Sequence, residues 1–309
     1  MQPGPRAARL AAACCAVLLS LASCATVPRR PSSEWLGVLP ADATMYISLS
    51  VSGSSDLIKK ALTTAGPDLQ DVNTLLGMTK RLVCSVTLAR GMPARFAVVA
   101  LGGYPGGIIG MRLSGNKEWT QKTGPSGPHW EWTKPGIQMS IPNNGILLAA
   151  NGDIDSLLAH WAAPLPLALP PEVASDMERA DLVFYMPELP GGLRQSAAEN
   201  GVHIPLNEVW VNAVKVKDGY NMSGTANTSS GQEAELLTLI LRLGLVGWMR
   251  SENLPAMAER LKAVSVSASG SQVKLAGLHF SDDEMFPFFL SLLKGMSPPE
   301  DAPDGGSPQ

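Results

Sequence analysis

The fold is decided by a stretch that reads Gly136-Ile137-Gln138-Met139-Ser140-Ile141-Pro142-Asn143-Asn144-Gly145-Ile146-Leu147-Leu148-Ala149-Ala150. Two short apolar segments lie on either side of Pro142-Asn143-Asn144, and turn formers between two such segments predict a β-hairpin. An acidic helix start, at Asp153 or Asp155, then leads into a helix that carries Trp161. The sequence therefore predicts a unit in which a hairpin is followed by an amphipathic helix.

The same order of elements recurs near the end of the chain. Segments 264–269 and 272–278 flank the short turn Gly270-Ser271, and Ser281-Asp282-Asp283-Glu284 has the form of a capping box that begins a terminal helix. Further hairpins are expected from segments 81–90 with 94–101 and 207–216 with 220–228. We therefore predict an α+β fold, α/β/α-like, with a mainly antiparallel sheet of hairpins and several amphipathic helices.

The segments between the hairpins are assigned from their apolar period. The expected elements are a strand at 44–51, helices that begin at Ser54 or Ser55 and at Asp68 or Asp71, a strand over Ile108–Leu113, and a short helix at Trp119.

The chain divides at a proline-rich segment. Residues 162–176 contain four prolines, which forbid a regular helix, so this segment is expected to join a first α+β half, 35–161, to a second, 177–296. Because both halves run from a strand through hairpins to a helix, an internal duplication is one interpretation. Chance similarity between two α+β units is the other, and the sequence leaves both open. Residues 297–309 are expected to be a disordered tail.

The N-terminus has the features of a secretory signal. Arg6 and Arg9 precede the apolar run 10–21, which at about 12 residues is shorter than the roughly 20 that cross a bilayer. The ending Leu21-Ala22-Ser23-Cys24 resembles the bacterial lipoprotein signal at all four positions. This resemblance implies cleavage before Cys24, lipidation of its sulfur and acylation of the new amino group. An ordinary secretory signal that ends in cysteine by chance is the alternative.

Removal of the signal peptide, residues 1–23, changes the charge and the cysteine count. It takes two of the 24 basic residues and none of the 27 acidic ones, so the formal charge becomes −5. Such a chain is not expected to bind nucleic acid, which requires a basic face, or anionic lipid through bulk electrostatics. Residues 24–34 form a lipidated, proline-containing tether. Beyond Cys24 only Cys84 remains, so no intramolecular disulfide can form.

Two segments of the mature chain are unusually apolar. In Glu233–Arg250, apolar side chains cover most of the helix circumference, and only Glu235, Thr238 and Arg242 form a polar strip. This helix is expected to lie in the plane of the bilayer interface, with the strip toward the headgroups. The residues expected to contact lipid are Leu236, Leu239, Ile240, Leu243, Val246 and Trp248 here, Phe286, Phe288, Phe289 and Leu292 in the terminal helix, and Trp161. The alternative is that each helix packs on a sheet as part of the core.

The sequence shows no catalytic constellation. His129, His160, His203 and His279 are scattered, without a second ligand at metal spacing. There is no Gly-x-Ser-x-Gly elbow and no Walker loop. We therefore expect no catalytic residue, no metal and no cofactor, and a non-enzymatic function.

The layout of signal, anchor, two α+β halves and apolar helices resembles the treponemal outer-membrane lipoproteins. The resemblance implies an α/β/α fold whose amphipathic helices enter the inner leaflet of the outer membrane and perturb it. We therefore expect a lipid-anchored protein at the periplasmic leaflet of the outer membrane, whose partner is the bilayer and whose helices increase membrane permeability. A periplasmic carrier of lipid or another hydrophobic ligand is the alternative, and an enzyme without recognisable motifs is a third. The sequence does not determine the oligomeric state.

Overall fold

A computed structural model describes residues 35–64, 69–89, 92–133, 136–191, 194, 198–199, 203–251 and 263–288. All described residues belong to one compact unit of the chain, which runs from residue 32 to residue 309. The predictions for the signal peptide, Cys24, the tether and the C-terminal tail therefore lie outside the described residues.

The described residues form both strands and helices. The strands are β1 (Met45–Ser50), β2 (Thr79–Thr87), β3 (Arg95–Gly102), β4 (Trp119–Gly124), β5 (Gly127–Trp132), β6 (Ile137–Asn143), β7 (Ile146–Ala150), β8 (Leu182–Met186), β9 (Glu208–Val216), β10 (Gly219–Asn227), β11 (Ser265–Ser269) and β12 (Gln272–Phe280). The helices are α3 (Val51–Thr64), α4 (Leu69–Met78), α5 (Gly106–Gly115), α6 (Ile154–Ala162), α7 (Pro171–Arg179) and α9 (Gly231–Ser251). Residues 282–288 are also helical and are called the C-terminal helix here.

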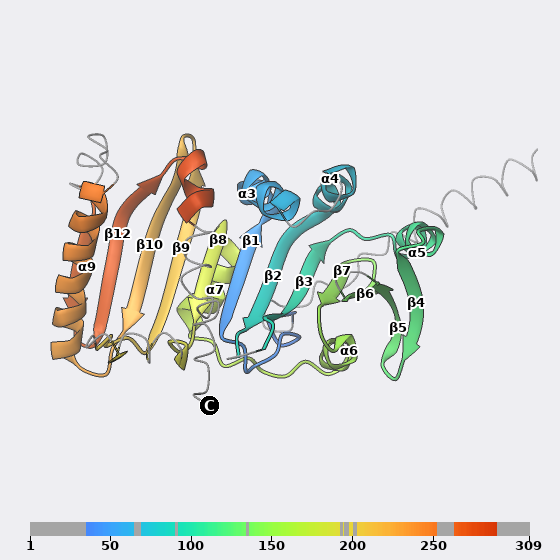
Figure 1. The fold of residues 1–309 in the computed structure, drawn as a ribbon, viewed down its shortest axis with the longest axis horizontal. Helices are drawn as coiled ribbons and strands as arrows, with labels where there is room; N and C mark the ends of the chain where they lie inside the picture. Colours follow the sequence, from blue (N-terminus) through green and yellow to red (C-terminus); the bar gives the residue numbers. More distant parts are fainter. Residues whose placement is uncertain are drawn as a thin grey trace, which may run out of the picture. The chain divides into compact units, whose positions relative to one another are not determined.

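All twelve strands belong to one antiparallel sheet (Figure 1). Its order is β11-β12-β10-β9-β8-β1-β2-β3-β7-β6-β5-β4. The predicted α+β fold with an antiparallel sheet of hairpins is thereby confirmed.

The two halves of the chain occupy the two ends of this sheet. They meet where β1 pairs with β8, for example Tyr46 opposite Tyr185. From this joint outward the order is β1-β2-β3-β7-β6-β5-β4 in one half and β8-β9-β10-β12-β11 in the other, so the first five positions correspond and the first half adds the hairpin of β4 and β5. In both, a helix follows the third strand, α5 after β3 and α9 after β10. The halves thus share a topology, while their origin by duplication stays a prediction.

Side chains of each strand alternate between two cores, one on each face of the sheet. Tyr46 of β1 belongs to a core formed with α6, α7 and the segment from Trp35 to Ala43. Met45 and Ile47 point to the other face, into a core with α3 and the C-terminal helix. The sheet is therefore covered on both faces near its centre, in an α/β/α arrangement.

Arg81 of β2 forms hydrogen bonds where the two halves meet, beside the pairing of β1 with β8. Its Nη1 donates to Ser48 Oγ at 2.9 Å, and to the carbonyl oxygens of Met177 at 2.8 Å and Ala180 at 3.1 Å. The last two lie at the end of α7, where helical carbonyls lack partners within the helix. Burial lowers the pKa of the Arg81 guanidinium, and the carboxylate of Asp181 opposes that shift. Arg81 thus fastens the first half to α7, which begins the second.

Two local predictions for the first half were wrong. Ile108–Leu113 lies in helix α5, because Ile109 and Leu113, four residues apart, pack together on the core of β6 and β7. Trp119, expected on a helix, instead begins β4, where it lies opposite Trp132 with ring centroids 5.8 Å apart.

Two helix starts also differ from expectation. Helix α7 begins inside the proline-rich joint, since Pro171 occupies the first helical turn, where the missing N–H is not needed. Helix α3 begins at Val51, earlier than expected, but a kink at Ser54 divides it, so that its longer part starts directly after Ser54 as predicted. Ser54 interrupts the helical dihedral angles there, and its hydroxyl donates to the carbonyl oxygen of Asp181 at 3.0 Å.

We expect Arg81→Met to lower the free energy of unfolding by about 3 kcal/mol, because it removes charge-assisted hydrogen bonds and leaves carbonyls without donors. Urea denaturation followed by circular dichroism measures this loss. Arg95→Met, at the exposed start of β3, is the control and should change stability by less than about 0.5 kcal/mol. Equal effects of the two substitutions would show that Arg81 does not hold the joint.

Candidate functional site

Helix α9 packs on the sheet with one side only. Ala234 is fully buried and Leu237 is 6% exposed, and both contact Val266 of β11 and Val273 of β12. This small core is continuous with the core under α3, because Val209 and Leu275 pack against both. Figure 1 shows α9 lying lengthwise at the β12 end of the sheet.

The opposite side of α9 is apolar and exposed. Leu236, Leu239, Ile240 and Leu243 are 45%, 53%, 41% and 63% exposed. With 3.6 residues per turn, these four fall within roughly 100° of the helix circumference. We call them the apolar stripe. The other exposed large hydrophobic residues of the described chain occur one or two to an element: Leu75, Met92, Ile108, Met111, Leu165 and Val214.

The predicted polar strip of α9 does not face outward as a unit. Thr238 is only 8% exposed, and its hydroxyl has no hydrogen-bond partner among the described residues. Arg242 turns to the sheet, where Nη2 donates to the carbonyl oxygen of Val266 at 2.6 Å. Val266 belongs to the edge strand β11, so Arg242 occupies a backbone acceptor that an edge would otherwise expose. Only Glu235 of the three remains directed to solvent.

The remaining predicted lipid contacts are distributed differently. Trp161 packs against the core around α6, and Phe286 and Phe288 pack against the core under α3. The rings of Phe288 and Phe280 lie 4.5 Å apart. The side chains of Trp161, Phe286 and Phe288 therefore contribute to the folded core. The side chains of Val246, Trp248, Phe289 and Leu292 lie outside what the structure describes.

Helix α5 carries a smaller exposed apolar surface that the sequence analysis missed. Ile108 is 55% exposed and Met111 is 74% exposed. The sequence predicts a strand over Ile108–Leu113. However, Ile108 and Met111 are three residues apart, and this spacing places both on one side of a helix. Helix α5 occupies the same place in its half as α9 does in the other.

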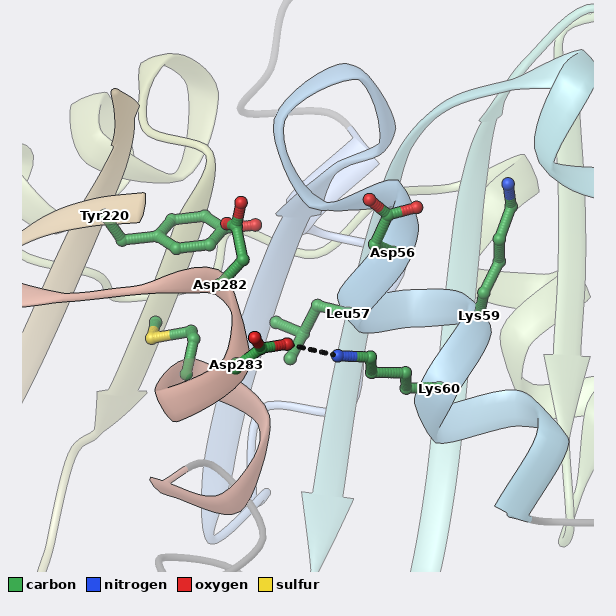
Figure 2. A pocket seen from close by; sticks show the side chains of 8 residues that line it. Asp56, Leu57, Lys59, Lys60, Tyr220, Asp282 and Asp283 are labelled. Carbon is green, nitrogen blue, oxygen red and sulfur yellow. Dashed lines mark ion pairs between the residues drawn. The ribbon is translucent and has the colours of Figure 1, made fainter. Parts of the chain in front are cut away.

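A first pocket lies between α3 and the C-terminal helix (Figure 2). It measures about 280 Å³. Asp283 faces Lys60 at 3.5 Å, and Asp282 forms an ion pair with Lys215. Tyr220 donates its hydroxyl to the carbonyl oxygen of Gly53 at 2.7 Å. These groups join two helices to the sheet, and these contacts do not couple a nucleophile to a base.

A second pocket, the Arg194 pocket, lies at the N-terminal end of α9 and measures about 300 Å³. Its polar lining comes from Arg194, His203, Asn207, Ser229 and Glu233, and residues 204–206 add an apolar wall. It therefore adjoins the helix that carries the apolar stripe.

The described residues offer neither a metal-binding cluster nor a membrane-spanning helix. They contain no group of three or more histidine, cysteine or acidic residues able to hold a metal ion. No helix among them is long and apolar enough to cross a bilayer.

Comparisons with known proteins agree with this fold. The family model described as outer membrane-associated lipoprotein TP0453 matches residues 31–236. Crystal form III of TP0453 superposes with a TM-score of 0.60 at 14% identity, covering 83% of this chain and 97% of that one. Form IV gives 0.59 at 15% identity, with 82% and 95% covered, and form I gives 0.60 at 16%, with 83% and 96% covered. No curated protein matches the chain.

Cys84 should not react with thiol reagents in the folded protein. Burial raises the pKa of its thiol to about 12, so the nucleophilic thiolate is scarce at pH 8. We expect Ellman's reagent to label Cys84 of a chain that begins at residue 25 only slowly at pH 8, and rapidly after addition of urea. Rapid labelling of the folded chain would contradict this and would make Cys84 a candidate nucleophile.

The two sides of α9 should respond differently to substitution. Leu239→Glu with Leu243→Glu should lower the free energy of unfolding by about 1–2 kcal/mol at most, because roughly half of each side chain is already exposed. Leu237→Ala should lower it by about 2–5 kcal/mol, since it leaves a cavity against β11 and β12. Urea denaturation compares the three proteins. If the double variant unfolds as readily as Leu237→Ala, the stripe belongs to the core.

Proposed function

This chain belongs to the TP0453 family of outer membrane-associated lipoproteins, and we propose from this premise that α9 binds the bilayer through its apolar stripe. In this proposal the protein is non-enzymatic and is anchored by lipid on Cys24 to the periplasmic leaflet of the outer membrane. Its partner is the lipid bilayer.

The exposure of the apolar stripe is the observation that supports the proposal most directly. Complete burial of a leucine or isoleucine side chain contributes about 1.5–3 kcal/mol. The four stripe residues are roughly half exposed, so their transfer into lipid would contribute about 3–6 kcal/mol. That is a weak attachment when it acts alone. Stable membrane binding generally needs two signals, and lipid on Cys24 would supply the other.

The packing of α9 favours a shallow position. Because its inner side is held by Leu237 and Arg242 against β11 and β12, the helix can reach lipid only with its outer side. An interfacial helix buries its apolar face about 5–10 Å into the boundary between headgroups and acyl chains. Insertion into one leaflet expands that leaflet and loosens its packing. We therefore propose that the protein increases the permeability of the membrane to small solutes.

The non-enzymatic part of the proposal is supported by the two pockets. Asp282 and Asp283 are each paired with a lysine, and Glu233 accepts a backbone hydrogen bond from Ser229 at 2.8 Å. Groups engaged in this way stabilise the fold and are poorly placed for proton transfer.

We expect a measurable fraction of the chain that begins at residue 25 to float with liposomes at high lipid concentration, although it carries no lipid, because the stripe alone supplies a weak attachment. Leu239→Glu with Leu243→Glu should abolish flotation, because each carboxylate would have to leave water when the stripe enters the bilayer. Sucrose-gradient flotation measures the bound fraction. Val214→Glu, which alters an exposed apolar residue on strand β9, is the matched control and should still float. Flotation of the stripe variant would contradict a role for α9, and sedimentation of the unchanged chain would leave Cys24 as its only membrane contact.

Vesicle leakage distinguishes insertion from lipid transport. We expect the chain to release an entrapped dye without removing labelled lipid, and the stripe variant to release none. Extraction of labelled lipid from vesicles that stay sealed would instead establish the carrier alternative.

A further inference from the structure

The Arg194 pocket lies where headgroups would meet the protein if the apolar stripe contacts a bilayer. Glu233 of the pocket precedes Leu236 of the stripe by three residues, which is about 4.5 Å along a helix axis. A volume near 300 Å³ is at the lower limit for small-molecule sites. The pocket therefore has room for a polar headgroup and not for acyl chains as well.

Arg194 supplies positive charge, and its side-chain contacts with the described residues are long. Its Nη1 lies 3.4 Å from Glu188 Oε1 and its Nη2 lies 3.5 Å from the carbonyl oxygen of Leu206. Both distances are at the long limit for such bonds. A guanidinium has five N–H donors in a planar fork that suits phosphate oxygens. Arg194 can therefore receive a phosphate without breaking a short hydrogen bond.

Glu233 supplies negative charge from a different element of the same pocket. Its Oε2 accepts the backbone N–H of Ser229 at 2.8 Å, while Oε1 lies 3.9 Å from His203 Nε2. That second oxygen is available to an ammonium group. The amide of Glu233 already donates to Ser230 Oγ at 3.2 Å, so the site does not depend on free amides of the helix N-terminus.

Fixed charges of both signs in one small pocket suit a ligand that is itself zwitterionic. We propose that the Arg194 pocket binds the phosphoethanolamine headgroup of a membrane phospholipid, with the phosphate at Arg194 and the ammonium at Glu233. The choice of a membrane lipid, rather than a soluble phosphate ester, rests on the proposed function of α9. A zwitterionic headgroup also avoids the repulsion that an anionic lipid would meet from a mature chain of net charge −5.

Soluble headgroups test the pocket without a bilayer. Glycerophosphoethanolamine should bind the chain that begins at residue 25, as measured by isothermal titration calorimetry. In NMR spectra of the same chain, it should shift the amide resonances of Asn207 and Ser229. Arg194→Gln and Glu233→Gln should each weaken binding by about tenfold or more, the loss of one charge-assisted contact. Glutamine at 233 can still accept from Ser229, so the helix start is retained. Arg112→Gln, an equal charge change on exposed α5, is the control and should have no effect.

Two further ligands identify the chemistry that is recognised. Glycerophosphocholine should bind more weakly, because its quaternary ammonium has no N–H to donate to Glu233. Inorganic phosphate should bind weakly or not at all. Equal binding of phosphate and glycerophosphoethanolamine would overturn the headgroup assignment in favour of a phosphate site. Absence of binding by all three ligands would overturn the site itself.

Vesicles identify the source and separate this inference from the proposal for α9. Vesicles that contain phosphatidylethanolamine should bind more of the chain than vesicles of phosphatidylcholine alone, and Arg194→Gln should remove that difference. Flotation without headgroup preference would overturn this inference and leave the role of α9 intact. The stripe variant should lose flotation and still bind glycerophosphoethanolamine, which would show that the pocket works independently of insertion.

Discussion

The antiparallel pairing of β1 with β8 is the constraint on which the rest of the structure depends. Without it each half would be a smaller sheet with a long unpaired edge at this position. The pairing is reinforced on one face by the ring contact of Tyr46 with Tyr185, whose centroids lie 6.1 Å apart. Arg81 reinforces it through the end of α7. Because β1 and β8 are both covered on both faces, this centre forms the most completely buried part of the sheet.

A joint at the centre places the last strands of each half at the ends of the sheet, and this position determines the character of α9. The helix packs on β11 and β12, beyond which the sheet has no further strand. Its inner side therefore has a core to contact and its outer side has none. Arg242 donates a hydrogen bond to a carbonyl oxygen of the edge strand. Its charge is therefore directed to the sheet and does not contribute to a polar outer face of α9. The outer surface that remains is leucine and isoleucine.

The proposed contact with a bilayer would account for such a surface. A soluble monomer gains nothing from four large apolar residues on one exposed helix face, whereas a membrane surface removes them from water. Membership of a family of outer membrane-associated lipoproteins agrees with this proposal. If the stripe contacts lipid as proposed, the Arg194 pocket lies next to the depth at which phosphate and ammonium groups of lipids lie. In this proposal the lipid on Cys24 lies among the acyl chains, the apolar stripe lies at the boundary between acyl chains and headgroups, and the Arg194 pocket lies at the headgroups.

Local patterns within the sequence determined the hairpins, the capping box at Ser281 and the apolar helix that became α9, because each depends on residues close together in the chain. The capping box is an example, since Glu284 accepts from the Ser281 backbone N–H at 2.7 Å. Only the tertiary structure decided which side of α9 is buried. Apolar residues cover most of that helix, so its own pattern cannot distinguish Leu237 from Leu239, and the choice is made by contact with Val266 and Val273. Tertiary contact likewise decides that Phe288 packs on Phe280 in the core, whereas the residues of the stripe are exposed. The β1–β8 joint and the pocket at Arg194 likewise join residues far apart in sequence, and their proximity follows from packing rather than from any local signal.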